Sequence, residues 1–137
     1  DQLDLRDTLY DFGNYTSETL TRKAWGRWDV KDWEGVKLYT QKCIKLHAQT
    51  AFKMQQQMSG FAPDGFIPYF WAVNDVGTSY FLLGWAYLEL DDKAKAREMF
   101  EAIVNDLAYA RCWNPKGFYW KVAEGAQKEL DQLDQKK

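Results

Sequence analysis

The chain has 137 residues, of which 46% are hydrophobic and 28% charged, and its net charge is −2. This length fits one domain with a buried core, and the composition excludes a disordered chain. The charge pattern excludes the clustered basic patch that nucleic-acid binding needs, because Lys and Arg are scattered among acids, as in residues 91–98. The longest apolar run, residues 80–88, is far shorter than the roughly 20 residues of a membrane span. The compartment, cytoplasm or periplasm, stays open.

The first half of the chain predicts a leader and one helix pair. The leader, residues 1–16, carries apolar residues at Leu3, Leu5, Leu9, Tyr10 and Phe12, and is expected to pack onto the domain. Residues 17–58 form an irregular first helix pair, with a first helix over about 17–28. Asp32 starts the second helix, which runs to about residue 58 because no helix breaker occurs before then.

The second half predicts an aromatic loop, a second helix pair and a last helix. Residues 59–73 contain two Gly and two Pro among many aromatics, which predicts an ordered loop packed on the helices. The second pair covers residues 74–109, with Asn74 or Asp75 capping its first helix and Asp91 or Asp92 starting its second. Asn114-Pro115 predicts the start of a helix over residues 115–135. No segment alternates in polarity, so we expect no sheet.

Small and large residues recur at fixed spacing in the second pair, at Leu83-Gly84, Tyr87, Ala96 and Phe100. This pattern resembles the tetratricopeptide repeat, in which small residues let two helices touch while large ones fill the space beside them. A weaker copy lies 60 residues upstream, where Ala24 matches Gly84, and residues 32, 36, 40 and 43 match residues 92, 96, 100 and 103. A third half-copy, with Tyr119 in the place of Tyr80, has no second helix.

The resemblance implies an all-α fold, an antiparallel helix-pair repeat array with a C-terminal capping helix. The segment around residues 112–122 is similar to the ending of short bacterial members of the family, some of which carry a glucanase label. In such arrays the first helices line an inner groove that binds a protein or peptide. Carried onto this sequence, the groove has five aromatic residues and a rim acid: Trp25, Trp28, Phe81, Trp85, Trp120 and Glu89.

The expected function is therefore protein or peptide binding by a scaffold module, with self-association through the same surface as a variant. Burial of these aromatics under the leader or the loop is the competing interpretation. The alternative function is glucan binding or hydrolysis, but no acid stands isolated in an apolar stretch, where a raised pKa would mark a general acid. We expect no enzyme.

Metal and cofactor sites are not expected either. Cys43, Cys112 and the single His47 are too scattered for a structural zinc site, which takes four close ligands. The two cysteines are compatible with one disulfide or with two free thiols. Glycine-rich phosphate loops are missing from the sequence.

Overall fold

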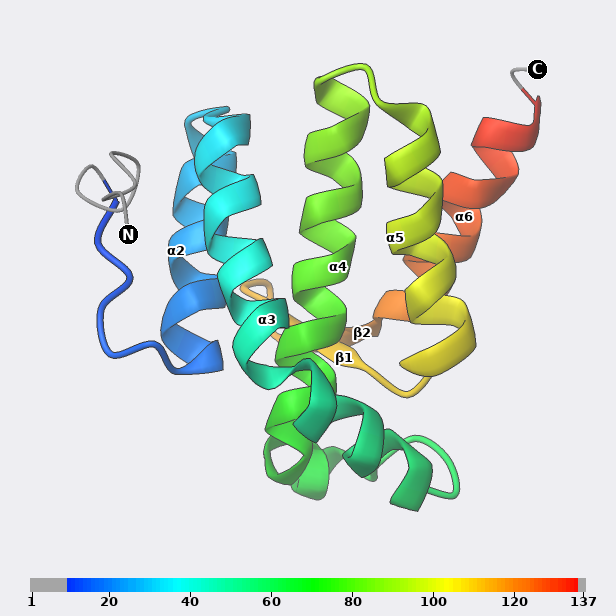
Figure 1. Cartoon of the computed structure of the whole chain (residues 1–137). Coiled ribbons are helices and arrows are strands. Elements are labelled where there is room, and N and C mark those ends of the chain that lie inside the picture. Colours follow the sequence, from blue (N-terminus) through cyan, green and yellow to red (C-terminus); the bar gives the residue numbers. More distant parts are fainter. Residues whose placement is uncertain (1–9, 136–137) are drawn as a thin grey trace.

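The computed structural model describes residues 10–135 and shows a mostly helical chain with one small hairpin (Figure 1). Its elements in order are α2 (Ser17–Asp29), α3 (Trp33–Gln57), η1 (Asp64–Phe70), α4 (Trp71–Glu89), α5 (Lys93–Asp106), β1 (Arg111–Asn114), β2 (Phe118–Lys121) and α6 (Val122–Gln135). The leucines of the leader lie outside the described residues.

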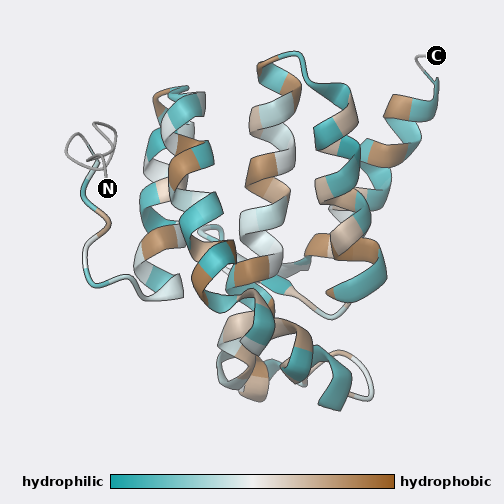
Figure 2. Ribbon diagram, in the orientation of Figure 1, coloured by the Kyte–Doolittle hydropathy of each residue, from teal (hydrophilic) through white to brown (hydrophobic). Residues whose placement is uncertain are grey.

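Two helix pairs, α2 with α3 and α4 with α5, stand side by side, with α6 beyond α5 (Figure 1). Helix α4 occupies the centre, where it contacts α2, α3, α5, α6, η1 and β1. Figure 2 shows α4 as largely white and brown, whereas the other helices carry long hydrophilic faces. The core therefore forms around α4, and this agrees with the expected packing of helices in pairs. None of the described helices is long and apolar enough to cross a membrane.

The turns that join the two pairs are the same structure, 60 residues apart. Lys31 and Asp91 both adopt a positive φ, 59° and 62°. Asp32 and Asp92 follow, and each caps its helix by accepting a hydrogen bond from the backbone N–H three residues on (3.0 and 3.1 Å). The backbone N–H groups of the two aspartates also donate to the carbonyl five residues back. Because the two turns have the same backbone conformation and hydrogen bonds, they direct the second helix of each pair in the same way relative to the first.

The seam of the second pair combines a missing side chain with a large one. Gly84 and Phe100 are buried, and a Cβ at Gly84 would lie 2.7 Å from two atoms of the Phe100 ring. Ala96 is fully buried on the same face of α5. The helices α4 and α5 can approach closely at this level because Gly84 has no side chain.

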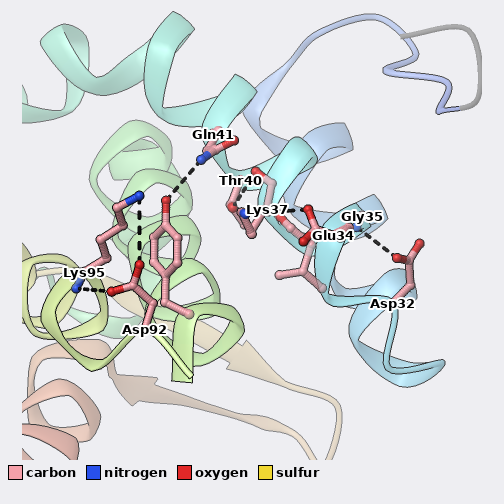
Figure 3. A network of polar contacts seen from close by, with 10 residues as sticks. Asp32, Glu34, Gly35, Lys37, Thr40, Gln41, Asp92 and Lys95 are labelled. Carbon is pink, nitrogen blue, oxygen red and sulfur yellow. Dashed lines mark hydrogen bonds and ion pairs between the residues drawn. The ribbon is translucent and has the colours of Figure 1, made fainter. Parts of the chain in front are cut away.

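Tyr87 joins the two pairs at one end of the bundle. Its hydroxyl accepts a hydrogen bond from Gln41 of α3 (3.2 Å; Figure 3). The ammonium groups of Lys37 and Lys95 lie 5.5 and 5.6 Å from the centre of its ring, one from each pair. These contacts connect α3 to the end of α4 and to the start of α5.

The last helix is present, but its expected start at residue 115 is wrong, as is the expected absence of a sheet. The strands β1 and β2 pair antiparallel, with Cys112 opposite Trp120 and Asn114 opposite Phe118. The side chain of Asn114 accepts from the N–H of residue 116 (2.9 Å), and Gly117 takes φ 106°, so Asn114-Pro115 opens a tight turn. Asn and Pro favour both turns and helix starts, and the aromatic run 118–120 favours a strand. The last helix therefore begins at Val122, and Tyr119 does not occupy the helical position that the repeat assigned to it.

The second half of the expected loop is also helical. Residues 64–70 form the 3-10 helix η1, which continues directly into α4 at Trp71. Asn74 and Asp75 therefore lie inside α4 and are not its caps. The side chain of Asn74 bridges two segments, because it donates to the Ile67 carbonyl and accepts from the Arg111 N–H (both 2.9 Å).

Candidate binding cavity

A cavity of about 1140 Å³ lies between α2, the η1–α4 junction and the hairpin. Its aromatic lining comes from all of these elements. The aromatic residues are Trp25, Trp71, Trp113, Tyr119 and Trp120. The ionisable side chains of the lining are Glu18, Arg22, Asp29, His47, Asp75 and Arg111, together with the thiol of Cys112.

Helical spacing places one face of α2 on the cavity. Thr16 caps this helix by accepting from the Thr19 N–H (3.2 Å). Glu18, Thr21 and Trp25 then follow at intervals of three and four residues, which puts them on one side of the helix. The same spacing on α4 presents residues 71, 74, 75 and 78 to the cavity. The two faces oppose each other because α2 and α4 are in contact.

The hairpin forms the remaining wall. It is fixed at its base, where the Val122 N–H donates to the Ala110 carbonyl (3.2 Å). Trp120 packs edge-on against Phe81 of α4, with ring centres 5.2 Å apart. Trp113 and Tyr119 form a cross-strand pair at 4.9 Å. These contacts hold the aromatic side chains of the hairpin along the cavity.

Asp75 is the most unusual group of the cavity. It is half-buried on α4 and accepts a hydrogen bond from the Ser17 hydroxyl of α2 (2.5 Å). Burial raises the pKa of the Asp75 carboxyl above its usual range, and the neighbouring carboxylate of Glu18 raises it further, against a lowering by the Ser17 hydroxyl and His47. The sequence did not predict Asp75 as a site residue because Asn74-Asp75 matched a helix cap.

His47 approaches the cavity from α3. Its Nε2 lies 2.9 Å from the Tyr15 carbonyl oxygen, so Nε2 is the nitrogen that carries a hydrogen. The imidazole meets the Trp71 ring edge-on at 5.9 Å. Both contacts orient the ring beside Trp71.

Arg111 directs its charge to the hairpin side of the cavity. Its Nη2 donates to the Tyr119 carbonyl (3.3 Å), and its guanidinium carbon lies 5.8 Å from the centre of the Phe61 ring. Lys121 lies over the same ring at 4.4 Å. The positive charges of Arg111 and Lys121 thus both lie at Phe61.

The expected groove residues divide into two groups. Trp25 and Trp120 line the cavity, while Trp28, Phe81, Trp85 and Glu89 are absent from its lining. Trp28 and Trp85 contact each other at 5.7 Å across α2 and α4, so their rings are half-buried against each other. Phe81 lies under Trp120 and against Phe100, and Glu89 is exposed at the end of α4. At the C-terminal ends of α2 and α4, the side chains of these two helices therefore fill the space between them.

The cavity is open in the part of the chain that the structure describes. Trp71 and Trp113 keep 43% and 53% of their surface exposed. Ile67 and Pro68 of η1 contribute to the wall. Part of the aromatic loop, residues 59–73, therefore forms one side of the cavity.

The two cysteines are free thiols and both are buried. Burial raises the pKa of Cys43 to about 12, and it also raises the pKa of Cys112. Over residues 10–135 there is no group of three or more His, Cys, Asp or Glu side chains that could hold a metal ion.

Comparisons of the chain with protein families, with curated proteins and with solved structures find no match.

Proposed function

We propose that the chain is a tetratricopeptide-like helical module that binds a segment of another protein in the cavity between α2, α4 and the hairpin. The observation that carries the proposal is the size and lining of this cavity, about 1140 Å³ with five aromatic side chains. Small-molecule pockets usually measure about 300–1,000 Å³, so the cavity has room for several residues of a peptide.

The repeated turn supports the tetratricopeptide-like assignment. Lys31-Asp32 and Asp91-Asp92 have equivalent conformations and hydrogen bonds 60 residues apart, which is the spacing that the sequence repeat predicts. In the family that the sequence resembles, the first helix of each pair lines the inner groove. The cavity lies on α2 and α4, the first helices of the two pairs.

The lining suits a peptide because it combines apolar rings with both hydrogen-bond donors and acceptors. Tryptophan and tyrosine rings bury partner side chains with little loss of their own conformational freedom, and they are frequent among residues that dominate binding energy. The amides of Asn74 and Asn114 and the hydroxyls of the threonines offer partners for peptide groups.

Glucan binding or hydrolysis is the second candidate function, and Asp75 is the observation that favours it. A half-buried carboxyl with a raised pKa, near a second acid at Glu18 and beside tryptophan rings, is the kind of group that glycoside hydrolysis uses. A titration with soluble β-glucan oligosaccharides, followed by tryptophan fluorescence and by release of reducing ends, separates this candidate from peptide binding.

The main test is a selection of displayed peptides on the folded chain, followed by affinity measurements on variants. Trp71→Ala is expected to weaken the selected peptides at least tenfold, because Trp71 is exposed within the cavity and hot-spot aromatics contribute about 2 kcal/mol or more. Tyr69→Ala is the matched control, since Tyr69 is 72% exposed, lies two residues away and does not line the cavity.

Two results would contradict the proposal. One is a selection that enriches no peptide above an unfolded control. The other is a set of enriched peptides that bind Trp71→Ala as well as wild type while losing affinity for Tyr69→Ala.

A further inference from the structure

We infer that the cavity contains a subsite for an arginine side chain of the bound segment, formed by Asp75, Glu18 and the Trp71 ring. The inference rests on the proposed function and adds the chemistry that the partner must carry. Three observations lead to it: the charge at this place, the ring beside it, and the direction in which the nearby cations point.

The charge at this place is negative, and no Lys or Arg of the described residues pairs with it. Asp75 of α4 and Glu18 of α2 are close enough for the second carboxylate to raise the pKa of the first. Among the described residues, neither carboxylate has a Lys or Arg within ion-pair distance. Among the described residues, the hydrogen bond to the Asp75 carboxyl comes from the Ser17 hydroxyl, which is one neutral donor for a group with two acceptor oxygens. A ligand cation that brings further N–H donors would satisfy both acids.

The ring beside these acids is placed to stack on a planar cation. Trp71 lies one turn before Asp75 on the same face of α4, and 43% of its surface is exposed. The edge-on contact with His47 fixes one side of the ring. A guanidinium group bonds to a carboxylate through two parallel N–H groups while its flat face lies on an aromatic ring. This geometry favours arginine over lysine.

The cations of the cavity do not fill this place. Arg111 is directed to Phe61 and to the Tyr119 carbonyl. Arg22 is exposed on α2 and forms no ion pair with Glu18, one turn away. Neither arginine contributes to the shift in the pKa of Asp75, whose only positive neighbour is His47.

The test compares two small probes that differ in charge and in one hydrogen-bonding group. N-acetyl-arginine amide and N-acetyl-citrulline amide have almost the same shape, but citrulline is neutral. Each is titrated into the ¹⁵N-labelled chain while the indole N–H resonance of Trp71, assigned with Trp71→Phe, is followed. We expect the arginine probe to bind at least ten times more tightly than the citrulline probe.

Two variants connect the preference to the acids. Glu18→Gln changes an exposed side chain, and Asp75→Asn keeps an acceptor for Ser17 while removing a charge that burial disfavours. Both are expected to fold and to reduce the arginine preference several-fold. Glu98→Gln, an exposed acid of α5 outside the cavity, is the matched control and should leave the preference unchanged.

Acid should also weaken binding of the arginine probe. Asp75 is protonated at a higher pH than an ordinary aspartate, so its charge is lost as the pH falls through that raised pKa. The groups that face Asp75 are Ser17 and Glu18 of α2, His47 and Cys43 of α3, and Cys112 of the hairpin. The two thiols stay neutral as the pH falls, because burial raises the pKa of both Cys43 and Cys112.

The outcomes distinguish this inference from the proposed function. Equal binding of the two probes, or an arginine preference that survives both Glu18→Gln and Asp75→Asn, would overturn the subsite. If displayed peptides bind and need Trp71 while the probes show no charge preference, the cavity binds peptides and the arginine subsite is wrong. An arginine preference without any selected peptide would keep the subsite and contradict peptide binding.

Discussion

The two helix pairs share their turns and their buried positions, yet they fill these positions with different side chains. In the second pair, Gly84 leaves room for the Phe100 ring. At the equivalent positions of the first pair, 60 residues earlier, stand Ala24 and Thr40, which are both fully buried. A small residue facing a large one is thus replaced by two residues of intermediate size. The comparison shows that two helix pairs can share their turn geometry while their side chains vary, provided that the volumes compensate.

The largest effect is expected from removing the large partner of the second seam. Phe100→Ala should lower the free energy of unfolding by about 3–5 kcal/mol, because it leaves a cavity where a fully buried ring stood. Thr40→Ala, at the equivalent position of the first pair, should cost about 1 kcal/mol, since the Thr40 hydroxyl bonds the Val36 carbonyl of its own helix (2.7 Å). Urea denaturation measures both. Equal losses would mean that the two seams do not differ in this way.

A smaller change in the free energy of unfolding tests the close approach of α4 and α5. It is expected to have opposite signs at Gly84 and at Gly26. Gly84→Ala should cost about 1–3 kcal/mol, since the new methyl group would lie 2.7 Å from a ring that is fully buried. Gly26→Ala is the control within α2, where a Cβ meets nothing within 4 Å. It should stabilise the chain by about 0.5–1 kcal/mol through helix propensity. A gain at both positions in thermal denaturation would show that Gly84 is not at a close contact.

The smallest effect concerns the repeated turn. Lys31 and Asp91 adopt a left-handed backbone conformation that costs free energy for a residue with a side chain but not for glycine. Lys31→Gly and Asp91→Gly should each raise the free energy of unfolding, by about 0.5–1 kcal/mol. The two gains should agree, since the turns have the same φ and the same hydrogen bonds. A gain at one turn with a loss at the other would break their equivalence.

The sequence was sufficient for the helix pairs but not for the cavity. The apolar stripes and the capping aspartates predicted where α2, α3 and α5 begin and end within a few residues, because those signals are local. The hairpin was missed because Asn114-Pro115 favours a helix start as well as a turn. Tertiary hydrogen bonds hold the hairpin in place, from Val122 to the Ala110 carbonyl and from Arg111 to the Asn74 side chain, and no local pattern shows them. Asp75 was missed for a related reason. It was expected at the start of the helix, but α4 begins at Trp71, and Asp75 therefore lies within the helix and lines the cavity.

The groove residues show the same limit. The repeat register selected one face of α2 and one of α4, and of the groove residues predicted on these faces Trp25 lines the cavity while Trp28, Phe81, Trp85 and Glu89 do not. It could not show which residues of these faces contact each other, as Trp28 and Trp85 do, and which line the cavity, as Trp25 and Trp71 do. That difference depends on tertiary packing, which no local pattern reports.

The most direct test of peptide binding in the cavity uses the tryptophans themselves. Of the seven in the chain, Trp25, Trp71, Trp113 and Trp120 line the cavity, and the other three, Trp28, Trp33 and Trp85, cluster outside it. In a ¹⁹F NMR titration of the 5-fluorotryptophan-labelled chain with a selected peptide, each resonance is assigned by single Trp→Phe variants. The account predicts large shifts for the four cavity resonances and small ones for the other three. Shifts led by Trp28, Trp33 and Trp85, with Trp71 and Trp113 unmoved, would contradict it.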